Sequence, residues 1–305
     1  MNNMGKRNDG PITHHSDKEE NDTPEIVITN CVINAQLMLI SILGNALVLA
    51  AIIRTPSIRS THMIMLCSLA VSDLLVALIV QPIYIAHQLT ADLGVAYHLW
   101  RLLGPSLCIV SLLTITAITV DRFLALHYHM RYATLVTEFR VKYTLISIWL
   151  ISILISVIDV WNELVYQFTL GSVTAISLAF STFSYIRIYR IVRRHQLNIN
   201  AQQQAMQSSN AGNNLNIHVA RFKRSAINTF VFYIALIICY LPMCVLLTFF
   251  GLSFMFWPRE WEYATTLVFF NSCINPFLYC WRLRELRTAV VKTARKMLCK
   301  ETEEH

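Results

Sequence analysis

A carboxylate stands in the middle of an apolar stretch of this sequence. Asp73 closes the run Leu-Ala-Val-Ser-Asp inside residues 62–87, which are mostly apolar. In such surroundings a carboxylate has to be neutralised, hydrated or paired with a cation. Hard cations prefer oxygen ligands, so Asp73 and nearby hydroxyl or amide groups form a candidate site for a hard monovalent cation.

Polar side chains in other apolar stretches are the candidate companions of Asp73. Asn45 and Ser111 each stand in a separate stretch, and Asn271 and Asn275 lie one helical turn apart on a common face. A second interpretation is that these groups only hold helices together through mutual hydrogen bonds. The spacing favours neither interpretation over the other.

A second charged motif ends another apolar stretch. Arg122 follows Asp121 at the end of residues 97–127. Arg122 can pair with Asp121 or turn away to contact another protein, which would make it a switch. The alternative is an arginine that extends its head group to the membrane boundary, as basic residues near helix ends commonly do. Position alone favours this alternative.

The elements that position these residues are long apolar segments. The 305 residues are 55% hydrophobic and only 14% charged, whereas a soluble domain carries about 25% charged residues. A helix that spans a bilayer needs roughly 20 mostly apolar residues. The stretches that meet this requirement lie at 25–53, 62–87, 97–127, 142–161, 164–194, 221–250 and 260–280. The expected fold is therefore an all-α bundle of seven transmembrane helices within residues 25–281.

Basic residues indicate how this bundle crosses the membrane. Lys and Arg gather in alternate connections and in residues 282–305, as they do in cytoplasmic segments. This pattern predicts an extracellular N-terminus and accounts for the net charge of +7 without a nucleic-acid partner. Residues 1–24 are expected to be a disordered extracellular tail with a glycosylation sequon at Asn21. Residues 195–220, rich in Gln and Asn, are expected to form a cytosolic loop.

The segment after the last span has helical periodicity of its own. Apolar residues recur between basic ones in residues 282–305. This pattern is typical of an amphipathic helix that lies on the lipids of the inner leaflet. Cys299 near its end is either a palmitoylation site or an unmodified cysteine.

Taken in order, these motifs resemble those of the rhodopsin-like (class A) G-protein-coupled receptors. One match falls in each span and together they cover nearly the whole chain. The matches are Gly44-Asn45, the LAxxD motif ending in Asp73, Asp121-Arg122-Phe123, Trp149, Tyr185, Cys239-Tyr240-Leu241-Pro242 and the NPFLY motif from Asn275 to Tyr279. Within the family, residues 131–140 and 275–287 look most like adenosine receptors. Other features look like melanocortin receptors, which share a subgroup with the adenosine, cannabinoid and lysophospholipid receptors.

The resemblance implies roles for the polar motifs. An allosteric sodium site is implied at Asp73, Ser111, Asn271 and Asn275, and no other cofactor is expected. A switch that meets a heterotrimeric G-protein is implied at Asp121, Arg122, Tyr185 and Tyr279, with Met130 inserting into that partner. Pro242 matches the hinge about which the sixth helix swings outward. The expected location is the plasma membrane.

The ligand does not follow from the resemblance. The ligand-contact candidates are Leu107, Cys108, Tyr240, Leu247, Phe250, Thr266 and Phe269. Gly104 stands where amine receptors hold an aspartate, and Tyr240 replaces the usual tryptophan. The apolar character of the candidates favours a small or lipid-like extracellular ligand over a strongly cationic one.

Other classes of protein fit the sequence less well. Transporters tend to show internal repeats with broken helices in matching positions, and no such repeat is present. No HExxH, GxSxG or glycine-rich phosphate loop points to an enzyme. The sequence therefore predicts a receptor that transmits a signal, with a transporter or channel as the alternative.

Overall fold

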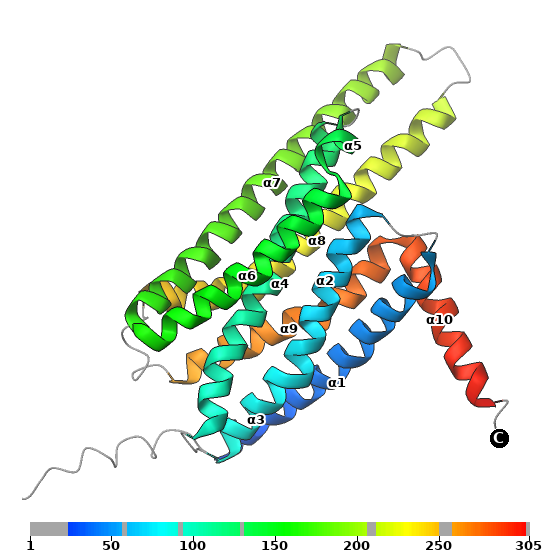
Figure 1. Cartoon of the computed structure of the whole chain (residues 1–305). Coiled ribbons are helices and arrows are strands. Elements are labelled where there is room, and N and C mark those ends of the chain that lie inside the picture. Colours follow the sequence, from blue (N-terminus) through cyan, green and yellow to red (C-terminus); the bar gives the residue numbers. More distant parts are fainter. Residues whose placement is uncertain are drawn as a thin grey trace, which may run out of the picture.

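The computed structural model describes residues 24–56, 60–90, 94–128, 131–205, 212–249 and 258–302, and these form a helical bundle (Figure 1). The elements are α1 (Pro24–Arg54), α2 (Thr61–Leu75), the π-helical turn η2 (Val76–Val80), α3 (Gln81–Thr90), α4 (Val95–His127), α5 (Tyr132–Leu135), α6 (Glu138–Trp161), α7 (Glu163–Ala205), α8 (Gly212–Phe249), α9 (Pro258–Arg282) and α10 (Arg284–Thr302). The predicted all-α class is confirmed.

Six stretches of the described helices are long and apolar enough to cross a membrane: 25–54, 61–90, 97–127, 138–159, 163–194 and 231–249. The seventh predicted span, α9, is less apolar because it carries Glu260 and Glu262 near its start and Asn271 and Asn275 farther along. It nevertheless lies within the bundle, packed against α1 and α8. Asn271 and Asn275 are buried among the other helices, whereas Glu260 is exposed.

The two ends of the bundle differ in what they carry. We call the end at which α1 begins the amino end; the connection between α6 and α7 and the start of α9 also lie there (Figure 1). The opposite end, where α10 begins, is the carboxy end. At the amino end Asn162 alone separates α6 from α7, and its side-chain oxygen accepts a hydrogen bond from the backbone N–H of Val165 at 3.1 Å. This cap makes so short a connection feasible, and α6 and α7 pack against each other.

The connection between α7 and α8 is shorter than the sequence predicts. The loop expected over 195–220 is helical as far as Ala205 and again from Gly212. The reason is that Ala and Gln are good helix formers and that adding a residue to an existing helix is easier than starting one. Polar composition was therefore a poor guide to the ends of this loop.

The second span is not one regular helix. At η2 the pitch widens, and the backbone N–H of Gln81 bonds to the carbonyl of Val76, five residues earlier. A π-turn of this kind changes the direction in which all later side chains point. Beyond it Tyr84 is buried, with 3% of its surface exposed. The turn thus helps to place Tyr84 inside the amino half of the bundle.

The predicted helix after the last span is present as α10. Leu286 is fully buried and Ala289 and Thr293 are buried, while Val291 is 44% exposed. Since α10 packs against α1, its buried face lies on the bundle and does not all face lipid. The side chain of Cys299 and the sequon residue Asn21 lie outside the described residues.

Candidate functional site

Asp73 is the centre of a polar core that joins three helices. Its side chain has no exposed surface. One carboxylate oxygen accepts hydrogen bonds from Ser111 of α4 at 2.9 Å and Ser272 of α9 at 2.8 Å, and the other accepts one from the amide of Asn275 at 2.8 Å. Among the described residues, no Lys, Arg or His forms an ion pair with Asp73. The carboxylate has dipoles around it but no counter-charge.

A proline explains how α1 joins this core. Pro276 has no backbone N–H, so it cannot donate the usual helical hydrogen bond to the carbonyl of Ser272. That carbonyl instead accepts hydrogen bonds from Asn45 at 3.0 Å and Ser41 at 3.3 Å. The helices can approach so closely because α1 has Gly44 here; a Cβ atom on Gly44 would lie 2.9 Å from the ring of Pro276. The position four residues before Pro276 marks the freed carbonyl of Ser272 in the sequence, but neither the contact of Ser41 with that carbonyl nor the hydrogen bond of the Ser272 hydroxyl with Asp73 was predicted.

The predicted cation-site residues do not all bind one another. Ser111 and Asn275 contact Asp73 directly, whereas Asn271 is buried and its amide nitrogen has no hydrogen-bond partner among the described residues. Ser72 extends the group through a 3.0 Å contact between its hydroxyl and that of Ser111. The core is therefore rich in hard oxygen donors around one uncompensated carboxylate, which fits a small monovalent cation.

Arg122 is held by its neighbour at the carboxy end of the bundle. Its guanidinium lies 3.0 Å from one oxygen of Asp121, which is 2% exposed. The other oxygen accepts a hydrogen bond from Tyr132 of α5 at 2.6 Å. Burial, and next this hydrogen bond, raise the pKa of Tyr132 to about 12, so the phenol remains a donor at neutral pH. Nδ1 of His62, on α2, lies 3.8 Å from a carboxylate oxygen of Asp121.

The other residues of the predicted switch flank α8. Tyr185 stacks on Tyr233 of α8, with ring centroids 4.9 Å apart and planes 6° from parallel. Tyr279 of α9 stacks on Phe232 at 5.4 Å. These contacts hold α8 against both α7 and α9 near its carboxy-end half. Met130 lies outside the described residues.

A cavity of about 380 Å³ opens in the amino half between α3, α4, α7, α8 and α9. Four of the predicted ligand-contact residues line it: Cys108, Tyr240, Leu247 and Phe269. Tyr240 also donates a hydrogen bond to the backbone carbonyl of Cys108 at 3.3 Å, so one wall residue ties α8 to α4.

Two predicted contact residues point elsewhere. Leu107 packs in an apolar cluster with Val80 and Tyr84, and it does not line the cavity. The hydroxyl of Thr266 bonds to Asn30 of α1 at 2.8 Å, while Thr265, the next residue around the helix, lines the cavity. Phe250 lies outside the described residues.

Much of the cavity wall was missed because the predicted contacts were a few, mostly apolar and aromatic residues of the third, sixth and seventh spans. Aromatic rings dominate: Tyr84 lies 5.1 Å from Trp100 and 5.4 Å from Phe269, between ring centroids. Charged groups lie toward the amino end. The missed lining residues include Tyr84, Trp100, Arg101, Glu163, Tyr166 and Glu262.

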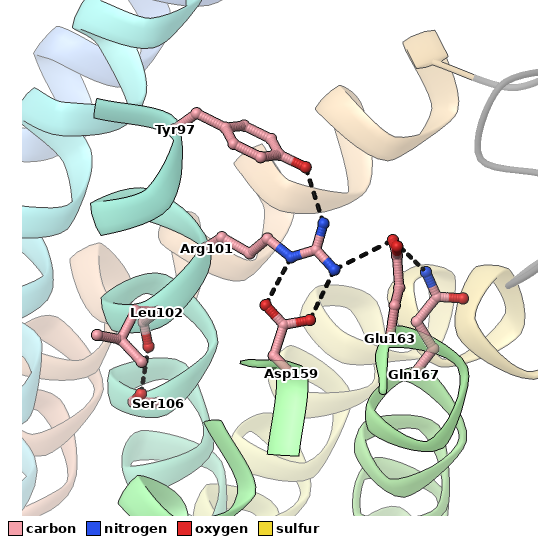
Figure 2. Close-up of polar contacts among 7 residues, drawn as sticks. All are labelled: Tyr97, Arg101, Leu102, Ser106, Asp159, Glu163 and Gln167. Carbon is pink, nitrogen blue, oxygen red and sulfur yellow. Dashed lines mark hydrogen bonds and ion pairs between the residues drawn. The ribbon is translucent and has the colours of Figure 1, made fainter. Parts of the chain in front are cut away.

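Arg101 is the hub of a polar network at the mouth of this cavity (Figure 2). Its guanidinium makes two short contacts with Asp159 of α6, at 2.6 and 2.7 Å, and donates to the hydroxyl of Tyr97 at 2.8 Å. A single longer contact, 3.2 Å, reaches Glu163 at the start of α7. Gln167 also donates to Glu163, at 3.4 Å. The network ties together the start of α4, the last turn of α6 and the start of α7, all at the amino end of the bundle.

Comparison with known proteins identifies the family. The family model described as 7 transmembrane receptor (rhodopsin family) matches residues 44–169 and 156–279. The chain belongs to the rhodopsin family of seven-transmembrane receptors. It is 30% identical to the histamine H2 receptor of Canis lupus familiaris over 296 residues, which cover 88% of this chain and 80% of that receptor. The histamine H2 receptor of Homo sapiens is 29% identical over 295 residues, covering 88% and 79%. The alpha-1A adrenergic receptor of Homo sapiens is 24% identical over 320 residues, covering 88% and 68%.

Membership of the family settles the class of function. The protein is a multi-pass membrane receptor that takes an extracellular ligand and signals through a G-protein; it is not an enzyme, and a transporter or channel is not favoured. The rhodopsin-like assignment made from the motifs is confirmed. The finer likeness to adenosine and melanocortin receptors is not supported, because these relatives are named as histamine and adrenergic receptors.

The Arg101 network makes a prediction about stability. Asp159→Asn should lower the melting temperature of the purified receptor more than Glu163→Gln does. Asp159 is 11% exposed and accepts two hydrogen bonds from Arg101, so the loss of its charge leaves part of the guanidinium poorly satisfied, at a cost of about 1–3 kcal/mol. Glu163 is 60% exposed, and an exposed ion pair contributes about 0–1 kcal/mol. Glu260→Gln, which removes an exposed carboxylate of α9, is the control. Equal losses in the two variants would contradict this ranking.

Proposed function

We propose that this receptor sits in the plasma membrane with its amino end outside, and that it binds a small organic molecule in the cavity at that end. A cavity of about 380 Å³ lies at the lower end of the range for small-molecule sites, which is about 300–1,000 Å³. The observation that carries the proposal is the double role of Tyr240, which lines the cavity and bonds to the carbonyl of Cys108.

Through Tyr240 a ligand can reach α8. Pro242 lies two residues beyond Tyr240 and leaves the carbonyl of Ile238 without its helical donor, so α8 bends here at lower cost. A ligand that alters the contact between Tyr240 and Cys108 favours one position of α8 over another. It shifts this equilibrium only by the difference in its affinity for the two positions.

The movement of α8 changes the contacts at the carboxy end of the bundle, where the G-protein binds. When α8 swings outward, the stacks of Tyr185 on Tyr233 and of Tyr279 on Phe232 separate. The opened face admits a heterotrimeric G-protein. Arg122 leaves Asp121 and contacts that partner, and Tyr132 keeps its hydrogen bond to the released carboxylate. Met130 belongs to the same contact surface in this proposal.

The polar core adds an allosteric sodium site. Asp73, Ser111 and Ser272 would hold the ion through oxygen atoms, with Asn275 and Asn271 beside them. The bound ion would supply the positive charge that the buried carboxylate lacks. The residues themselves join α2, α4 and α9, so the state of Asp73 bears on how tightly these helices pack.

A ligand screen tests the cavity. Cells that express the receptor are challenged with a broad panel of small molecules, and cAMP and calcium are recorded separately. Leu170→Trp should abolish any response by filling the cavity, which Leu170 lines from α7. The control is Phe180→Trp, because Phe180 is 57% exposed on the outside of the same helix. Surface amounts of both variants are measured. A response that survives Leu170→Trp would place the ligand elsewhere.

Arg122→Ala should abolish nucleotide exchange on the G-protein while the receptor still reaches the cell surface. The reason is that Arg122 supplies the charge that contacts the G-protein once Asp121 releases it. Exchange is measured with membranes and purified G-protein, and Arg284→Ala on the exposed side of α10 is the control. Undiminished exchange in Arg122→Ala would rule out the switch.

Asp73→Asn should remove the response of the receptor to sodium. The amide keeps the size of the carboxylate but carries no charge to attract a cation. Melting temperatures are compared in sodium chloride and in choline chloride; sodium should stabilise the wild type and leave the variant unchanged. Glu285→Gln, an exposed carboxylate of α10, should keep the wild-type response. The same sodium effect in Asp73→Asn and in the wild type would remove the cation site.

A further inference from the structure

The wall of the cavity formed by α4 offers no carboxylate. Gly104 lines the cavity, and a Cβ atom at this position would overlap the six-membered ring of Trp100. The ring of Trp100 therefore fills the space into which any side chain at position 104 would grow. It contacts Tyr84 and Phe269, with centroids 5.1 and 5.9 Å away. This wall is a cluster of aromatic rings, whose faces attract organic cations.

The charges near the mouth of the cavity do not balance. Asp159 occupies the guanidinium of Arg101 with both oxygens and does not line the cavity. Glu163 does line it, and reaches Arg101 through one contact of 3.2 Å. One guanidinium and two carboxylates leave this group of three with a net charge of −1. Because Asp159 alone neutralises Arg101, the surplus charge belongs to Glu163, whose carboxylate Figure 2 shows beside both Arg101 and Gln167.

We infer that the ligand carries a cationic group, of the kind a protonated amine provides, and that Glu163 is its counter-ion. This inference rests on the proposed ligand cavity and names the chemistry it selects. The ammonium takes the place of Arg101 at Glu163, while Arg101 keeps both contacts with Asp159 and its contact with Tyr97. The body of the ligand lies against the aromatic wall formed by Tyr84, Trp100 and Phe269.

The ammonium can replace Arg101 at Glu163 because Arg101 holds Glu163 more weakly than it holds Asp159. Its side chain is 60% exposed, against 11% for Asp159, and exposed ion pairs contribute little to stability. An ammonium that is partly removed from water makes a stronger, charge-assisted hydrogen bond with a carboxylate. An anionic ligand would instead have to displace Asp159 from its two contacts with Arg101 and to approach a second carboxylate, Glu163.

This conclusion revises the expectation from the sequence, which favoured a ligand without strong positive charge. That expectation followed from the apolar candidates and from Gly104 in the third span. The proposed counter-ion, Glu163, lies at the start of α7, whereas the contacts predicted from the sequence lie in the third, sixth and seventh spans. The similarity to histamine and adrenergic receptors, which are named for amines, agrees with a cationic ligand.

The test uses the purified full-length chain and matched probes of opposite charge. The probes are a set of arylalkyl amines including phenethylamine, histamine and noradrenaline, with phenethyl alcohol and phenylpropionate as the neutral and anionic analogues. Thermal stabilisation is recorded against probe concentration for the wild type, Glu163→Gln, Glu163→Asp and the control Glu260→Gln. We expect at least one amine to stabilise the wild type. Glu163→Gln should weaken it tenfold or more, Glu163→Asp should retain part of the effect, and Glu260→Gln should behave like the wild type.

Three results would overturn the inference: no amine stabilises the wild type, the neutral or anionic analogue acts as well as the amine, or Glu163→Gln leaves the midpoint concentration unchanged. The variant Leu170→Trp shows whether the role of Glu163 alone has failed or the proposed ligand cavity has failed too. If an amine loses its effect in Leu170→Trp but keeps it in Glu163→Gln, the cavity stands and the role of Glu163 falls. If the amine keeps its full effect in both variants, the proposed cavity falls as well.

Discussion

A carboxylate without exposed surface has to be stabilised by groups from several helices at once, and this requirement organises the bundle. Among the described residues, the three side-chain donors to Asp73 all come from other helices, so its hydrogen bonds bring α4 and α9 against α2. The proline that creates the bend in α9 also frees the carbonyl of Ser272, which recruits Asn45 of α1. The polar contacts of Asp73 and of the Ser272 carbonyl are therefore also the contacts through which these helices pack. Moving any of these helices changes the surroundings of a buried charge, which makes small displacements energetically large.

The same logic applies at both ends of the bundle, with the charges closer to water. At the amino end Arg101 draws α6 and α7 to α4; at the carboxy end Asp121 draws Arg122, Tyr132 and His62 together. Among the side chains that the structure describes, α8 is joined to α4 by a hydrogen bond from Tyr240. Ring stacks join it to α7 and α9, and the hydroxyls of Thr182 and Tyr233 form a further contact of 3.0 Å with α7. Neutral hydrogen bonds of this kind are weaker than the charge-assisted ones that Arg101 makes with Asp159.

The sequence predicted the fold and the polar core because both depend on contrast: a polar residue in an apolar stretch is conspicuous, and Asp73, Ser111 and Asn275 do meet. It predicted less of the cavity. Cys108, Tyr240, Leu247 and Phe269 line it, but Thr266 and Leu107 point elsewhere, since a shift of one residue turns a side chain by about 100° around a helix. The π-turn at η2 adds a rotation that helical periodicity does not contain, and it brings in Tyr84. The contacts of Arg101 with Asp159 and Glu163 join residues about 60 positions apart, and only the packing of α4 on α6 and α7 reveals them.

The absence of an acidic residue at position 104 does not by itself decide the charge of the ligand. What a cavity selects depends on the sum of its charges and on which of them are already satisfied, not on one position. Arg101 considered alone would attract an anion, yet Asp159 already neutralises its charge through two short contacts. Once that pair is set aside, Glu163 is the member of the network that both faces the cavity and is left over. In the proposed arrangement the counter-ion of a cationic ligand lies on α7, and the ring of Trp100 fills the space beside Gly104 on α4.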